Sequence, residues 1–146
     1  MTKAPMTVIS GKYAVGITLT SKAQNPVTVT GTITPSNSIA LYGPGGGTNS
    51  WTISNAGSIG GGAHTGIALG DTIMYVATGI VTNQAGGRIS GYDIGVNIGG
   101  PGTLTNAAGG TIIGSHSDGV YFGSLAPATV INNGVLIGGF GGEYMR

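Results

Sequence analysis

The stretch TLTNAAGGTIIG, at residues 103–114, contains the pattern that decides the fold. An asparagine is followed by glycines, a central aliphatic residue and a further glycine, and this order returns about every two dozen residues. A period of roughly 20 to 50 residues is typical of solenoids, because one repeat cannot bury its apolar face alone and must stack on its neighbours. The pattern therefore predicts about six turns. Their central aliphatic residues are Ile9, Ile33, Ile59, Ile89, Ile112 and Leu136.

Alternation inside each unit predicts strands rather than helices. In VTVTGTIT (residues 27–34) and GITLT (16–20), aliphatic residues recur at every second position, which is the period of a half-buried strand. The chain holds 31 glycines among 146 residues. Glycine costs about 1 kcal/mol in a helix interior relative to alanine, whereas it suits sharp corners that need positive φ.

We therefore expect one all-β domain over residues 1–146, a single-stranded parallel β-helix (β-solenoid) that is a fragment of a longer repeat array. Its axis is expected to be filled by a stack of inward aliphatic residues, with successive turns about 4.8 Å apart. The stack is predicted to contain Val29, Ile53, Val81, Leu104 and Val130.

An asparagine precedes the central aliphatic residue in four of the units. In a stacked coil these side chains fall at one corner, where each amide can bond to the backbone or to the next amide. We expect a structural ladder rather than a ligand site. Its members are Asn55, Asn83, Asn106 and Asn132.

Composition excludes several classes of function. Only 6% of the residues are charged, the net charge is +1 and the five Lys and Arg residues are scattered, so no basic stripe is available for nucleic acid. Without cysteine there are neither disulfides nor thiolate metal sites. No apolar segment is long enough for membrane insertion, and the start MTKAPMTVIS lacks the pattern of a signal peptide. No cofactor is expected.

The repeats resemble the passenger repeats of bacterial autotransporters and related filamentous-haemagglutinin-like adhesins. The resemblance covers roughly residues 7 to 142 and rests on units such as WTISNAGSIGGGAHTGIALG (51–70) and LTNAAGGTIIGSHSDGVYFG (104–123). It implies a right-handed parallel β-helix that passes through an outer-membrane barrel and is displayed outside the cell. The implied function is that of a non-enzymatic adhesin or stalk at the bacterial surface, with a host-surface protein or glycan as partner.

An enzymatic or metal-binding alternative depends on one corner of the coil. Aligning the turns on the glycine before the last strand places two histidines and two acids in neighbouring turns, and both residue types are good ligands for divalent metals. A β-helix enzyme acting on carbohydrate would also need paired carboxylates. Ser115 or Ser117 beside the histidines could form a triad, but no Gly-x-Ser-x-Gly elbow accompanies them. The corner consists of His64, Asp93, His116 and Asp118.

Threonine rows offer a further alternative, because regular outward Thr-x-Thr pairs resemble those of ice-binding β-solenoids. Threonine is also a common outward residue of strands, and isoleucine interrupts the rows twice. The aligned pairs are predicted to be Thr28 and Thr30, Thr52 and Ser54, Ile80 and Thr82, Thr103 and Thr105, and Thr129 and Ile131.

Interruptions of the repeat are the expected sites of binding loops, because insertions into solenoids emerge on one face. The interruptions are residues 42–50, 70–79 and 123–128, and the tyrosines that could stack on sugars are Tyr42, Tyr75 and Tyr92.

The two ends of such a coil predict a second kind of partner. Backbone donors and acceptors that are left unpaired at each end form a template for another chain, so we expect end-to-end self-association.

Overall fold

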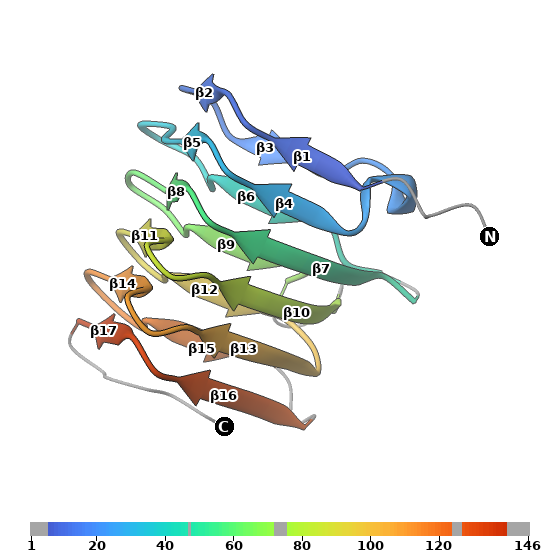
Figure 1. The fold of residues 1–146 in the computed structure, drawn as a ribbon. Helices are drawn as coiled ribbons and strands as arrows, with labels where there is room; N and C mark the ends of the chain where they lie inside the picture. Colours follow the sequence, from blue (N-terminus) through green and yellow to red (C-terminus); the bar gives the residue numbers. More distant parts are fainter. Residues whose placement is uncertain (1–5, 47, 72–75, 124–126, 140–146) are drawn as a thin grey trace.

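The chain folds into stacked coils of short parallel strands, as the computed structural model in Figure 1 shows. The structure describes residues 6–46, 48–71, 76–123 and 127–139. Three sheets run along the stack, with sheet A at the front of Figure 1, sheet B at the left and sheet C behind. Sheet A contains β1 (Thr7–Ile9), β4 (Val27–Val29), β7 (Ser50–Asn55), β10 (Thr78–Asn83), β13 (Gly102–Asn106) and β16 (Ala128–Asn132). Sheet B contains β2 (Lys12–Tyr13), β5 (Thr32–Ile33), β8 (Ser58–Gly60), β11 (Arg88–Gly91), β14 (Thr111–Gly114) and β17 (Val135–Gly138). Sheet C contains β3 (Ile17–Thr18), β6 (Leu41–Gly43), β9 (Ile67–Leu69), β12 (Val96–Ile98) and β15 (Val120–Phe122).

Each strand pairs in parallel with the strand three places before or after it in the chain, so the paired segments belong to successive coils. This arrangement confirms the prediction of an all-β parallel β-solenoid. About four turns stack on a neighbour at both sides. The turns that begin with β4, β7 and β10 do so in all three sheets, and the turn that begins with β13 does so in sheets A and B, because β15 is the edge strand of sheet C. The predicted figure of about six counts the first and last coils as well, and among the described residues these stack on one side only. A single turn of 3-10 helix, η1 (Lys22–Gln24), begins after Ser21 and joins the first coil to the second.

The register corrects the predicted core stack at one position. Val27, rather than Val29, pairs with Ile53, and Val29 pairs instead with Asn55. Both valines point inward and both are buried, so alternation along the strand could not distinguish them. The observed inward stack is Val27, Ile53, Val81, Leu104 and Val130.

The first coil also differs from the prediction. Ile9 belongs to sheet A, where it pairs with Val29, and the residue opposite Ile33 in sheet B is Tyr13. The remaining central aliphatic residues do stack as predicted, from Ile33 to Leu136. The segment around Ile9 alternates like any other inward-facing strand, so its sequence did not reveal which sheet it joins.

Glycine is abundant chiefly because the coils pass close to one another at their corners. A Cβ added to Gly57 would lie only 2.1 Å from the carbonyl oxygen of Gly31, and one added to Gly31 would lie 2.1 Å from that of Gly11. None of these three glycines has a positive φ. The expectation that glycine serves positive φ holds, among the described glycines, for Gly46, Gly62, Gly70, Gly86 and Gly109.

Trp51 fills the core at a position where the neighbouring strands lack bulk. Its side chain is buried and occupies the space beside Gly43, where an added Cβ would meet the indole Cδ1 at 2.8 Å. The indole Nε1 donates to the carbonyl oxygen of Pro44 at 3.0 Å. In the next coils Gly79 and Gly102 stand at the same register, and the side chain of Ile98 packs against both of them.

Candidate functional site

The four repeated asparagines are joined into one chain of amide hydrogen bonds. In the first three, Nδ2 donates to the Oδ1 of the asparagine in the next coil, which lies directly opposite in the register of sheet A. Three of the four side chains are fully buried, and the last one is exposed. The bonds run from Asn55 to Asn83 at 2.8 Å, from Asn83 to Asn106 at 2.9 Å and from Asn106 to Asn132 at 2.9 Å.

The ladder also ties each coil to backbone carbonyls. Asn83 Nδ2 lies 3.0 Å from the carbonyl oxygen of Gly87 in its own coil and 3.2 Å from that of Thr111 in the next coil. The backbone N–H of Gly57 donates to Asn55 Oδ1 at 3.1 Å. Toward the N-terminus the register continues with the apolar Val29, so the ladder begins at Asn55. The amide groups of the repeat are therefore engaged in holding coils together.

The corner does not gather its side chains into a metal site. His64, Asp93 and the pair His116 and Asp118 lie on loops of three successive coils. Within the described residues, no group of three or more His, Cys, Asp or Glu side chains is placed to hold a metal ion. Both histidines are exposed, whereas Asp118 is only 7% exposed. Its carboxylate accepts a hydrogen bond from the Ser117 hydroxyl at 3.1 Å.

Backbone hydrogen bonds join the corner's loops. The Ser117 N–H donates to the carbonyl oxygen of Asp93 at 3.0 Å, and the His116 N–H donates to that of Tyr92 at 2.7 Å. The hydroxyl of Ser117 is directed to a carboxylate rather than to a histidine, so it is not arranged as the nucleophile of a triad. Backbone hydrogen bonds therefore hold the corner's successive loops against one another.

Tyr92 forms the one ring stack recorded among the described residues. Its ring lies parallel to that of His116, with 5.1 Å between the ring centroids and 8° between the planes. The tyrosine side chain is nevertheless 49% exposed. The other two predicted binding tyrosines are placed differently: Tyr42 is half-buried on sheet C, and Tyr75 lies outside the described residues.

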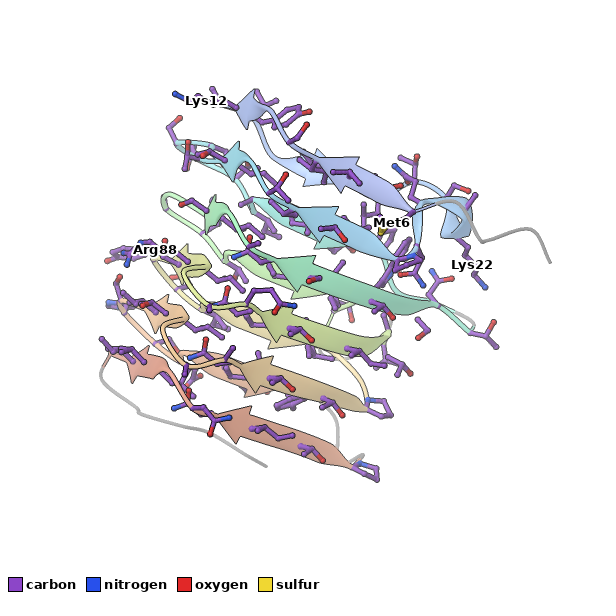
Figure 2. All side chains as sticks on the ribbon, viewed as in Figure 1. Met6, Lys12, Lys22 and Arg88 are labelled. Atoms are coloured by element: carbon purple, nitrogen blue, oxygen red, sulfur yellow. The ribbon has the colours of Figure 1, made fainter. Side chains whose placement is uncertain are left out.

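An open groove lies on the outer face of sheet B, next to Tyr92. Its lining combines hydroxyl groups, one cationic side chain and one aromatic ring, and Figure 2 shows Arg88 on the outer side of β11. None of the described residues that line it is acidic. Sequence reasoning predicted Tyr92 but missed the groove. The main lining residues are Thr34, Pro35, Gly60, Arg88, Ser90 and Tyr92.

The threonine rows are less regular than predicted. Thr28 pairs with Ser54, and Thr52 pairs with Ile80, so the predicted alignment of Thr28 with Thr52 was wrong by two residues. Isoleucine then interrupts each row, at Ile80 and at Ile131. The interruptions place exposed apolar side chains where a regular hydroxyl lattice would be needed.

Comparison with known proteins gives this chain no assignment, since no family model, curated protein or solved structure matches it. Among the residues that the structure describes, no helix combines the length and the hydropathy needed to cross a membrane.

Proposed function

We propose that this chain is a non-enzymatic structural and surface-interaction module, an adhesin or stalk segment similar to an autotransporter passenger. The observation that carries the proposal is the strictly local pairing of the coils. Each strand bonds only to the equivalent strands of the coils before and after it, in all three sheets. The resemblance of the repeats described above supports the same role.

Local pairing suits a protein that folds as it emerges from a membrane. In a solenoid each repeat contacts only its neighbours, so folding can nucleate at one end and propagate coil by coil. The chain has no cysteine, so folding awaits no disulfide formation. A right-handed coil is part of the proposal. Its support is the path in Figure 1, where the front strands run to the left, the rear strands run to the right and the chain descends.

Display on a bacterial surface tests the proposed role. With the leader and the outer-membrane barrel of a characterised autotransporter fused to its ends, the chain is expected to reach the cell surface as a folded, protease-resistant core. The measurement is protease treatment of intact cells, followed by detection of the surviving fragment. A native passenger of similar length on the same barrel is the control. Retention of this chain inside cells that export the control would overturn the proposal.

End-to-end stacking is the partner interaction that we propose for the isolated chain. Within the part of the chain that the structure describes, the outermost strands β1 and β16 pair on one side only, and exposed apolar residues such as Val8 and Ile131 lie on them. A parallel edge at one end of the stack matches the opposite edge of a second copy. Sedimentation velocity is expected to show species larger than a monomer, in proportions that rise with concentration.

A matched pair of lysine variants distinguishes end-to-end stacking of copies of this chain from nonspecific association through exposed apolar side chains. Ile131 lies on the edge strand β16 and is 47% exposed, whereas Ile80 lies in an interior coil and is 46% exposed. Ile131→Lys should shift the distribution toward monomer, because charged side chains discourage pairing at sheet edges. Ile80→Lys should leave it unchanged. A monomer at all concentrations, or equal effects of the two substitutions, would exclude stacking through this end.

A further inference from the structure

The groove on sheet B is formed by a missing side chain. Gly60 stands at an outward position of β8, opposite Ser90 of β11. A Cβ placed on Gly60 would lie 3.4 Å from the Ser90 hydroxyl oxygen and 3.5 Å from Thr34 Cγ2, so space above the backbone is available. Farther along the same row, Ile113 pairs with Ser90 and supplies a bulky side chain. The groove is therefore a local hollow at Gly60, with Thr34 and Ser90 on either side of it.

Tyr92 presents a fixed ring beside this hollow. The parallel stack on His116 holds one face of the ring, and about half of the tyrosine side chain remains exposed. The same residue lines the groove. Because the stack restrains its orientation before any ligand arrives, the ring can receive an apolar face of a ligand at a reduced entropic cost of ordering.

Arg88 supplies the charge that selects the ligand. Its side chain is exposed, it lines the groove and no acidic residue accompanies it among the described lining residues. A guanidinium group binds a carboxylate through two parallel hydrogen bonds, which a point charge such as lysine cannot reproduce. The hydroxyls of Ser90 and Ser115 add groups that both donate and accept hydrogen bonds.

We propose that this groove binds a carboxylated sugar residue of an acidic polysaccharide. The sugar's apolar face packs on the Tyr92 ring, its carboxylate pairs with Arg88 and its hydroxyls bond to the serines. One cation, one ring and a set of hydroxyls match a uronic acid unit in number and kind. The proposal rests on the proposed surface role only in one respect, namely that the ligand is encountered outside the cell. Binding itself requires no export.

Chemical-shift titration of the isotopically labelled chain tests this site with two matched ligands. Tetragalacturonate is expected to shift the backbone amides of Gly60, Ser90 and Tyr92, while its methyl ester, which has no negative charge, binds at least about tenfold more weakly. Equal binding of acid and ester would overturn the assignment of Arg88. Shifts confined to other parts of the chain would overturn the site.

Three substitutions locate the interaction. Arg88→Gln should weaken tetragalacturonate binding at least about tenfold, whereas Lys12→Gln, which removes an exposed cation from the same row of sheet B, should change it less than about twofold. Tyr92→Ala should also abolish most of the chemical-shift change that tetragalacturonate causes. Equal effects at Arg88 and Lys12 would show general charge attraction and refute the site. Surface display does not enter this titration, so each proposal can fail while the other stands.

Discussion

Substitution of Asn83 by aspartate should lower the free energy of unfolding by about 3–5 kcal/mol at neutral pH. The Asn83 amide is fully buried and donates to Asn106 Oδ1 and to the carbonyl oxygens of Gly87 and Thr111. A carboxylate has no proton to donate, so it would place an unpaired negative charge among three acceptors. Urea denaturation of the variant and the parent chain at pH 7 measures the difference.

The loss of stability caused by Asn83→Asp should be smaller at acidic pH. Burial raises the pKa of the introduced carboxyl above its value in the unfolded chain, because the charged form is poorly solvated. The unfolded state therefore releases its proton first as pH rises, and stability falls through this range. Below a pH of about 4 the carboxyl is protonated in both states and can donate one hydrogen bond, which restores part of the stability. Repeating the urea series at low pH checks this sign.

Asn132→Asp is the matched control. Asn132 lies at the exposed end of the ladder, where its Oδ1 accepts bonds from Asn106 Nδ2 and from the N–H of Gly134. An aspartate accepts both bonds equally well, so the expected loss is below about 1 kcal/mol. Similar losses at positions 83 and 132 would contradict the directional ladder described above.

Alanine at position 57 should cost about 3 kcal/mol, although glycine-to-alanine changes in ordinary extended backbone are neutral or stabilising. The new Cβ would meet the carbonyl oxygen of Gly31 at 2.1 Å. That same oxygen accepts the Ser58 N–H at 2.9 Å, so moving the coils apart would break a hydrogen bond between them. Thermal and urea unfolding of the variant measure the cost.

The control lies three residues farther along the chain. Gly60→Ala places a Cβ at ordinary contact distance, 3.4 Å from its nearest neighbour, and Gly60 has no positive φ. It should leave stability within about 0.5 kcal/mol of the parent chain or raise it slightly. If both substitutions destabilised the chain equally, close approach of the coils would not explain the glycines at these corners.

The repeat and its alternation were sufficient to predict the class of fold, but they did not determine the register. Val27 and Val29 point to the same face of β4, so a shift of two residues preserves every inward and outward assignment. The choice between them depends on how many residues each corner uses, and corner length varies from coil to coil. The same ambiguity assigned Ile9 to the wrong sheet.

The groove could not be predicted because it depends on a missing side chain and on which residues pair across coils. A glycine at position 60 becomes a hollow only when its neighbours in adjacent strands are known. The Tyr92 and His116 stack likewise joins residues 24 positions apart through their place on successive loops. Alignment of the turns placed the corner's residues on loops whose backbones do lie together. It gives no information on side-chain direction, and the Asp118 carboxylate bonds to its neighbour Ser117.

The ladder makes the length of this protein adjustable in whole units. Asn83 lies opposite Asn106, so the segment 84–106 forms one complete circuit that ends on the same kind of amide with which it began. A tandem copy of that segment would have matching amide donors and acceptors at both of its junctions. A copy of the segment before Val29 would instead place an apolar residue at the register of the ladder. In genetic terms, duplication within the asparagine region lengthens the rod without new contacts, so its reach can change by recombination alone.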